Sequence, residues 1–488
     1  MATNNIVAKI WSFCDTLRDD GVSYGDYLEQ ITYLLFLKMA DEYSVSKDRK
    51  DYNIPKNCDW KSLLETDVSQ LINTYTNNLK ILSDSGGMLS KIFNGAQNKI
   101  HDQYKLRKLI ELINEENWIS ESVDVKGDIY ESLLQKNAES SGAGQYFTPR
   151  PVIQAMVECI GPRPMETISD PSCGTGGFFL GALNYLQSNF NLSAEQANFL
   201  KFSTFHGWEI VPATARLCLM NLFLHGIGDL KSTPEIEVTD SLKESLKEKV
   251  NIVLANPPFG KTSSDVITND EKKGKQAGYF FRKDIWVTTS NKQFAFLQHI
   301  VSMLVPEGGK AAVVLPDNVL FEGGVGESIR KHLLEDIDLH TILRLPTGIF
   351  YAQGVKANVL FFETKKKSKK PSTKDVWFYD YRTNIHHTPK KNPLQFESLS
   401  DFVKCYSVGN RKKRKATWSD NNTEGRWRKY TYDEIISRDK ASLDIFWLKD
   451  DNLIDLENLP EPDDLINDII ENMESALANF KTIRDSIS

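Results

Sequence analysis

The tetrapeptide Asn256-Pro257-Pro258-Phe259 combines a side-chain amide, two prolines and an aromatic ring, and it follows the apolar run Ile252–Ala255. The two prolines restrict the backbone and remove two N–H donors. The side-chain oxygen of Asn256 and the carbonyl oxygen of Pro257 can then both point outward as acceptors. Two acceptors that hold the hydrogens of a ring-conjugated amino group favour a pyramidal nitrogen with an available lone pair. Phe259 offers a ring face on which an extruded base can stack.

A second motif places a carboxylate beside a glycine-rich turn. The turn runs from Asp170 through Gly174, Thr175, Gly176 and Gly177, after a short strand-like run and before an apolar helical run. Glycine lets the backbone turn tightly and lets a ligand lie against it. The phosphate-loop pattern GxxxxGK[ST] and the dinucleotide pattern GxGxxG are both absent. A carboxylate beside such a turn suits a ligand with a cationic amine and little phosphate, such as S-adenosylmethionine.

Two more acidic residues follow in the order that a nucleoside pocket requires. Glu209 ends the run 205–209, where a carboxylate can accept both ribose hydroxyl hydrogens. Asp240 follows the next strand-like run and can accept from an adenine amino group. Each residue alone is more often a surface acid, but their order after the glycine turn supports a binding site.

An alternating pattern of strands and helices is needed to bring these motifs to one edge. Short β-prone runs alternate with helical runs such as 178–190, 214–225 and 294–304, which predicts an α/β fold with a parallel sheet covered on both faces. The expected strands are 167–169, 204–208, 236–238, 252–255, 310–315, 340–345, 358–363 and 376–381.

The flanking regions differ from this centre. Residues 1–140 show apolar residues at helical spacing and are predicted to form an all-α domain, which ends at the small-residue hinge 140–144. Residues 141–400 form the predicted catalytic domain. The pattern weakens in 401–488, where the amphipathic run 462–487 predicts a helical tail whose apolar face, Leu465 to Phe480, can contact a partner subunit.

Composition excludes several classes of protein. The 488 residues carry a net charge of −7, which disfavours nucleic-acid binding by bulk charge. No apolar run approaches the roughly 18 residues of a membrane-spanning helix. The first residues do not resemble a secretory signal, and the six cysteines lack zinc, redox or disulfide spacing. We therefore expect a cytoplasmic protein without a metal site.

Several other features have more than one interpretation. The tract 365–374, with its many lysines, is interpreted as a solvated hairpin tip in preference to a DNA contact. The basic cluster 411–415 fits a phosphate contact or a solvated loop equally well. His386 and His387 lack a partner at metal spacing. Trp418 and Trp427 lie near the basic cluster, where packing is favoured over base stacking.

The motif order, glycine turn first and then Glu209, Asp240 and the NPPF tetrapeptide, resembles that of gamma-class amino-group DNA methyltransferases. More narrowly, the chain resembles the modification (M) subunit of type I restriction–modification systems over nearly its whole length. The shared segments include 33–41, 144–150, 220–226, 308–321 and 345–350. The segment GQYFTPR is specific to this family in combination with the turn. The resemblance implies that it packs over the cofactor through Gln145, Tyr146, Phe147, Thr148, Pro149 and Arg150.

This resemblance also implies a fold, an activity and partners. The fold is that of class I S-adenosylmethionine-dependent methyltransferases, with a Rossmann-like seven-stranded sheet. The activity is site-specific N6-adenine methylation of a flipped base in DNA. The partners are a specificity (S) subunit, which would join two M subunits, and a restriction (R) subunit.

Two alternatives remain at this point. An NPPF-type site also suits another acceptor, such as a protein glutamine amide. The second alternative is a noncatalytic scaffold that binds cofactor only to regulate assembly. The intact Asn256 and Phe259 argue against it.

Overall fold

The computed structural model describes residues 12–13, 17, 21–45, 54–115, 132–134, 147–229, 232–245, 248–260, 265–350, 356–388, 392–449 and 473. Several predictions fall outside these residues. They concern the hinge 140–144, the residues Gln145 and Tyr146, and the tail 462–487 other than Met473.

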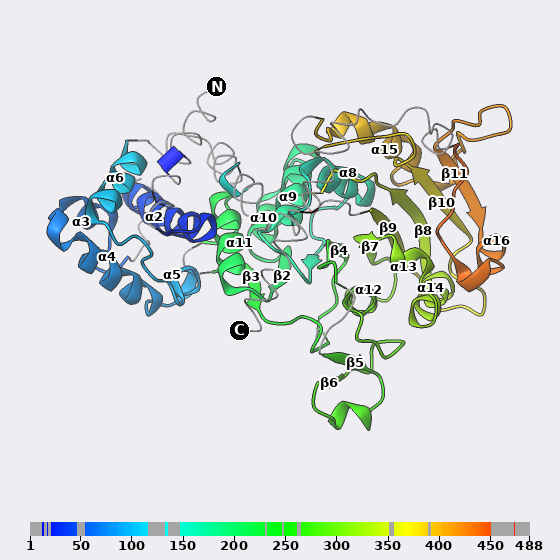
Figure 1. Ribbon diagram of the computed structural model, residues 1–488, viewed down its shortest axis with the longest axis horizontal. Coiled ribbons are helices and arrows are strands. Elements are labelled where there is room, and N and C mark those ends of the chain that lie inside the picture. Colours follow the sequence, from blue (N-terminus) through cyan, green and yellow to red (C-terminus); the bar gives the residue numbers. More distant parts are fainter. Residues whose placement is uncertain are drawn as a thin grey trace.

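The described part of the N-terminal region is helical, as the sequence predicts, and lies at one end of the molecule (Figure 1). Aspartates begin three of its helices: Asp59, Asp67 and Asp102 each accept a hydrogen bond from a backbone N–H of the first turn. The helices are α2 (Tyr24–Val45), α3 (Trp60–Glu65), α4 (Val68–Ser83), α5 (Gly87–Phe93) and α6 (Gln103–Asn114).

A mixed sheet forms the centre of the molecule, with strand order β11-β10-β8-β9-β7-β4-β1-β2-β3 in the described chain. Strand β9 is antiparallel to both of its neighbours, β11 is antiparallel to β10, and the other pairs are parallel. The strands are β1 (Ile168–Asp170), β2 (Phe205–Glu209), β3 (Glu235–Val238), β4 (Ile252–Ala255), β7 (Lys310–Pro316), β8 (Ile337–Arg344), β9 (Ala357–Thr364), β10 (Asp375–Asp380) and β11 (Trp427–Thr431).

The sheet corrects three expectations. It is mixed and not parallel, because β9 and β11 are antiparallel to their neighbours. The seven strands from β3 to β8 match the expected methyltransferase sheet, and β10, which was predicted at 376–381, and β11 extend it to nine in the described chain. Strand β11 follows residue 400, where the sequence predicted no strand, because its five residues are too few and too polar to show a pattern. The tract 365–374 is not a hairpin tip, because β9 and β10 pair with opposite sides of β8 and the connection must cross that strand.

Helices cover both faces of the sheet (Figure 1). One face carries α8 (Arg150–Ile160), α9 (Gly177–Asn189) and α15 (Ser400–Tyr406), and the other carries α12 (Lys292–Met303), α13 (Asn318–Phe321) and α14 (Val325–Glu335). Two large apolar clusters, one on each face, form the core. The remaining α-helices are α10 (Ala194–Phe202), α11 (Pro212–Leu224) and α16 (Tyr432–Ile436), and β5 (Val266–Thr268) pairs with β6 (Tyr279–Phe281) in a small projecting ribbon.

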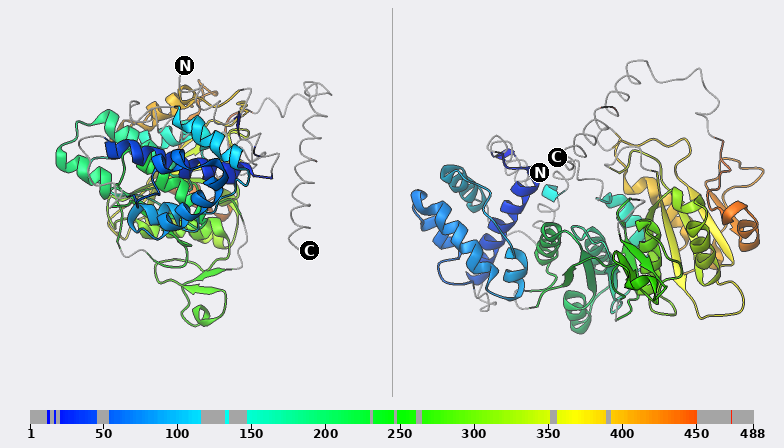
Figure 2. Two further views of the ribbon diagram at one scale, coloured as in Figure 1. Left: turned by 90° about the vertical axis from the view of Figure 1, so that its left-hand side faces the viewer. Right: turned by 60° about the horizontal axis from the view of Figure 1, so that its bottom comes forward.

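Helix α11 joins the N-terminal helices to the sheet. Phe223 on α11 packs against Phe36 of α2 with ring centroids 5.2 Å apart. Arg216 donates from Nε to Glu29 at 3.1 Å and from Nη1 to the carbonyl of Asn94 at 2.9 Å. The N-terminal helices and β11 therefore mark opposite ends of an elongated molecule (Figure 2). In the part of the chain that is described, no helix has the length and apolar character needed to cross a membrane.

Candidate active site

The carboxyl ends of four strands bring the predicted motifs to one edge of the sheet. Strands β1, β2, β3 and β4 are mutually parallel neighbours, so their ends point the same way. Asp170 is the last residue of β1 and Glu209 the last of β2. Asp240 lies two residues after the end of β3, and Asn256 directly follows β4. The sequence order predicted this edge correctly.

The two central glycines of the turn have different requirements. Both have positive φ, 54° at Gly174 and 84° at Gly176, which L side chains rarely adopt. A Cβ at Gly176 would lie 2.9 Å from Sγ of Cys218, whereas a Cβ at Gly174 would meet no atom within 4 Å. Gly176 thus permits close packing on α11, and Gly174 faces open space that a ligand can approach.

Asp170 is a buried carboxyl at the base of this turn, with 2% of its surface exposed. Burial raises the pKa of Asp170 to about 8, although the hydrogen bond from the backbone N–H of Ser172, 2.9 Å, acts in the opposite direction. The charge of Glu209 raises it further. A cationic group brought to this position would favour the ionised carboxylate, so the site fits the amine of S-adenosylmethionine.

Glu209 and Asp240 are oriented by backbone N–H groups. The Oε2 atom of Glu209 accepts from Gly174 at 3.1 Å and Oε1 accepts from Val211 at 2.8 Å, while burial raises its pKa. Asp240 accepts from the backbone N–H of Leu242 at 3.1 Å. Each oxygen can accept a further hydrogen bond. Both carboxylates are therefore held in place and can still receive hydroxyl or amino hydrogens.

Asn256 has one amide atom paired and the other free. Its Nδ2 donates to Oγ1 of Thr148 at 2.9 Å, and its Oδ1 is buried without a hydrogen-bond partner in the structure. Buried polar atoms are normally paired, because an unpaired one costs about 1–3 kcal/mol. An orphaned acceptor at the end of β4 is therefore the expected state of a group that receives a hydrogen from a substrate.

The remaining residues of the tetrapeptide form a wall beside this acceptor. Pro257 is buried, while Pro258 and Phe259 are half-buried. The ring of Phe259 meets the ring of Phe350 edge to face, with centroids 6.2 Å apart. Edge-to-face packing supports Phe259 and orients its ring for stacking.

The structure places the GQYFTPR residues less uniformly than the resemblance implies. Thr148 is buried and contacts Asn256, so it supports the tetrapeptide. Pro149 precedes α8 as its N-cap residue and Arg150 begins that helix. Gly177 lies against α8, where a Cβ would approach Ile153 to 3.1 Å.

Three residues without a predicted role fix the turn. Asn221 on α11 donates to the carbonyl of Thr175 at 2.9 Å. Ser241 donates to the carbonyl of Pro171 at 2.8 Å and so ties the loop after β3 to the turn. Ser172 approaches the carbonyl of Asn256 at 3.5 Å. Asn221 lies in the segment 220–226 and Ser241 directly follows Asp240, but their residue types do not indicate these contacts.

The secondary candidates resolve into structural roles. Trp427 is fully buried and stacks on Trp377 at 5.1 Å, so packing is confirmed. His387 contacts the hydroxyl of Tyr381 at 2.9 Å and the carbonyl of Asn392 at 3.0 Å. Among the described residues, no group of three His, Cys, Asp or Glu side chains is placed to hold a metal ion.

Comparison with known proteins identifies relatives over the whole chain. The N-6 DNA methylase family matches residues 121–443, and the HsdM N-terminal domain matches residues 6–113. The type I restriction enzyme StySJI methylase subunit of Salmonella typhimurium is 39% identical, with 99% of this chain and 95% of that protein covered.

Two solved structures are also similar over full length. The crystal structure of the type I restriction enzyme EcoKI M protein is 33% identical with a TM-score of 0.54, covering 99% of this chain and 96% of that one. A chain from a structure that addresses complex assembly and conformational transition of the type I R-M system is 26% identical with a TM-score of 0.71, covering 99% and 98%.

Proposed function

Because this chain belongs to the N-6 DNA methylase family, with type I restriction enzyme methylase subunits as full-length relatives, we propose that the edge formed by Asp170, Glu209 and Asn256 is its methyl-transfer site. The protein is an adenine-N6 DNA methyltransferase, and S-adenosylmethionine is its cofactor. The unpaired, buried Oδ1 of Asn256 is the observation that supports this placement of the chemistry.

The glycine-rich turn and the residues around it would hold the cofactor. Asp170 faces its amine, Gly174 leaves room for it, Glu209 accepts from the ribose hydroxyls and Asp240 accepts from the adenine amino group. Gln145, Tyr146, Phe147, Thr148, Pro149, Arg150, Thr175, Gly176 and Gly177 complete the proposed cofactor set. When bound, S-adenosylmethionine supplies a methyl group made electrophilic by a positively charged sulfur.

Asn256 and Pro257 would hold the adenine amino group. The Oδ1 of Asn256 and the carbonyl of Pro257 accept its two hydrogens, which leaves the nitrogen lone pair available for the methyl group. Pro258 fixes the backbone and Phe259 stacks on the extruded base. Acceptors fixed before the substrate arrives cost no reorganisation during the reaction, so alignment and electrostatics supply most of the rate enhancement.

Replacing Asn256 separates chemistry from cofactor binding. We expect Asn256→Ala to retain cofactor affinity in calorimetry and to lose about 10²–10³-fold in methyl transfer, by analogy with loss of one oxyanion-hole donor. Asn189→Ala, at the exposed end of α9, is the matched control and should transfer methyl groups normally. Methylation by Asn256→Ala at the control's rate would refute the assignment.

The two alternative functions are not favoured. The family is defined by DNA methylation, which argues against a protein glutamine amide as acceptor. A noncatalytic scaffold would have no need for an orphaned acceptor at Asn256. Transfer of labelled methyl groups to protein in place of DNA would reverse this choice.

We also propose partners, a division into domains and a compartment for this chain. We propose that two copies of this chain join one specificity subunit, which reads the DNA site, and that a restriction subunit completes the complex.

The chain then divides into a helical domain (1–140), a catalytic domain (141–400) and a C-terminal region (401–488), of which 427–431 extends the catalytic sheet. Free cysteines and a DNA substrate suit the cytoplasm. Mass measurement of the co-expressed subunits tests the stoichiometry.

A further inference from the structure

Two basic tracts that lie far apart in the sequence meet at one place on the surface. One follows β9 and the other precedes β11. Most of their lysines are exposed, and none of these forms an ion pair among the described residues. Lys374 is also exposed, but it directly precedes β10 and is not counted with the others. The other seven exposed lysines, hereafter the lysine patch, are Lys366, Lys367, Lys369, Lys370, Lys412, Lys413 and Lys415.

Asp338 holds the two tracts together. Its Oδ2 lies 2.6 Å from Nζ of Lys365 at the start of one tract and 2.7 Å from Nη1 of Arg411 at the start of the other. Arg411 also pairs with Glu363 at 2.6 Å. The buried Arg414 anchors the second tract by donating to Oγ1 of Thr341 at 2.9 Å.

The lysine patch carries an excess of positive charge. The two carboxylates that join the tracts are already paired with Lys365 and Arg411. Glu307 and Asp336 line a surface hollow together with patch lysines and offset only part of the charge of the seven lysines. The excess is therefore local, in a protein whose net charge is −7. Such local concentration of one sign attracts a polyanion even when the whole molecule repels it.

The patch lies on the edge of the sheet opposite the active site. Asp338 is the second residue of β8, whereas Asn256 follows the last residue of β4. Both strands run in the same direction, since β9 is antiparallel to β7 and to β8 while β4 is parallel to β7. At about 3.3 Å per residue, the length of β8 alone separates the two edges by about 25 Å.

The chemistry of the patch favours nucleic acid over protein. Residues 366–370 and 412–416 contribute no large apolar side chain, whereas the centre of a protein interface is apolar and poor in lysine. Protein–DNA interfaces are strongly positive, and lysine contacts phosphates as a point charge without reading bases. A straight duplex with its adenine at Asn256 would not reach this edge, because DNA bends little over a few turns.

We propose that the lysine patch binds the phosphate backbone of a second stretch of duplex DNA, apart from the stretch whose adenine lies at Asn256. The contact is independent of sequence and holds flanking or neighbouring DNA on the far edge of the catalytic sheet. It extends the methyltransferase function by a second DNA-binding surface, and its loss leaves the catalytic residues intact.

Charge-neutral variants of the full-length protein test this surface. The quadruple variant K366Q/K367Q/K369Q/K370Q and the triple variant K412Q/K413Q/K415Q remove the patch in two parts. The triple variant K80Q/K91Q/K108Q removes three charges, as many as the triple patch variant, from exposed positions on the N-terminal helices and is the control. Binding of a random-sequence duplex is measured by fluorescence anisotropy over a range of salt concentrations, with cofactor affinity and methyl transfer as parallel readouts.

The salt dependence distinguishes the outcomes. Each phosphate contact that is lost should reduce the slope of log K against log salt by about 0.9, and affinity at low salt should fall about tenfold or more. Cofactor affinity and methyl transfer to a short duplex should stay unchanged. An unchanged slope in both patch variants, or an equal loss in the control, would overturn the proposal. Intact DNA binding with lost association of a partner subunit would assign the patch to an acidic protein surface instead.

Discussion

The side chain of Asn256 is held by Thr148, whose hydroxyl oxygen accepts from its Nδ2 at 2.9 Å. Thr148 lies two residues before α8, and Asn256 directly follows β4, so the bond joins segments 108 positions apart in sequence. Because Thr148 takes the amide hydrogen, the oxygen of Asn256 is the atom left to face the substrate. The segment before the glycine turn thus positions Asn256, the proposed acceptor for the amino group, in addition to its proposed contact with the cofactor.

Removing the hydroxyl of Thr148 should lower the rate of methyl transfer. In Thr148→Val the amide of Asn256 loses its partner and is free to rotate, so its oxygen is no longer held toward the substrate. One net hydrogen bond of about 1.4 kcal/mol corresponds to a tenfold lower kcat. Steady-state kinetics should show that fall with little change in cofactor affinity, and Thr148→Ser should restore the rate. A Val variant as fast as the Ser variant would mean that the bond does not position Asn256.

The stability of the cofactor-free protein should decrease as pH rises toward 8. Burial raises the pKa of Asp170 from an ordinary value of 3.8 to about 8. Between these values the folded state binds more protons than the unfolded chain, so raising the pH favours unfolding. The contribution is fully present below 3.8 and is lost once the pH passes about 8. Urea titrations at several pH values should show this decline, and Asp170→Asn should reduce it.

Cofactor affinity should change with pH in the opposite direction. A cationic amine beside Asp170 favours the ionised carboxylate, so below the pKa of about 8 binding must expel a proton. Affinity should therefore rise by up to about tenfold per pH unit until that value and then level off. Calorimetry in buffers of different ionisation enthalpy measures the proton released. Binding without proton release at pH 7 would place the amine elsewhere.

The two glycines of the turn should respond differently to alanine. Both substitutions impose a left-handed conformation on an L residue, which costs about 1–2 kcal/mol. Gly176→Ala also drives a methyl group against Sγ of Cys218 and should cost about 1–3 kcal/mol more. Gly174→Ala meets no neighbour and should reduce cofactor affinity more than stability. Urea unfolding and calorimetry on both variants test the difference, and equal losses of stability would contradict it.

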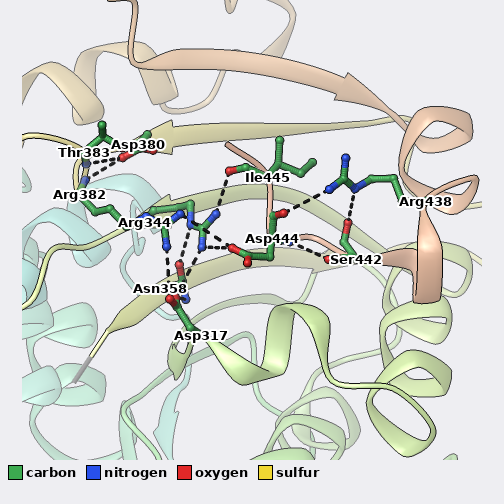
Figure 3. A network of polar contacts seen from close by, with 10 residues as sticks. All are labelled: Asp317, Arg344, Asn358, Asp380, Arg382, Thr383, Arg438, Ser442, Asp444 and Ile445. Atoms are coloured by element: carbon green, nitrogen blue, oxygen red, sulfur yellow. Dashed lines mark hydrogen bonds and ion pairs between the residues drawn. The ribbon is translucent and has the colours of Figure 1, made fainter. Parts of the chain in front are cut away.

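A buried arginine, Arg344, lies at the edge of the sheet that carries the candidate site, at the end of β8 (Figure 3). Arg344 at the end of β8 is fully buried, lies 3.6 Å from Asp317, pairs with Asp444 and donates to the carbonyl of Ile445 at 2.8 Å. Arg382 also pairs with both carboxylates, so Arg344→Met would remove one of their two cations and leave the carbonyl of Ile445 without its donor. This change should destabilise the fold by about 1–3 kcal/mol. The neighbouring Arg438 is exposed, so Arg438→Met should cost less than about 1 kcal/mol in the same urea titration.

The sequence was sufficient to place the candidate site residues at one edge of the sheet, because its motifs follow strands. Ile252–Ala255 is apolar throughout and ends at Asn256, so both the strand and the chemistry after it are visible in one segment. Asp170 and Glu209 also end strands. At these three positions the local pattern and the proposed chemistry fall in one segment, so the edge of the sheet could be inferred from the sequence.

Contacts between distant segments could not be inferred in this way. The bond from Asn221 to Thr175 and the ion pairs of Asp338 join residues whose types are ordinary on a helix or a strand. The basic cluster 411–415 illustrates the difficulty: Arg411 and Arg414 serve the fold, while the lysines between and after them are exposed. The charge of a side chain alone does not tell a structural arginine from an exposed lysine, because the rest of the fold determines which side chains are buried.

The position of β9 has a consequence for synthesis of the chain. It lies between β7 and β8, yet it is made after both. Until residues 357–364 have left the ribosome, the facing edges of β7 and β8 have no strand between them, and such open edges template aggregation. The catalytic tetrapeptide leaves the ribosome well before this strand. A nascent chain therefore carries the complete chemical motif while the sheet that must hold it is still open, and it is most vulnerable to misassembly in that interval.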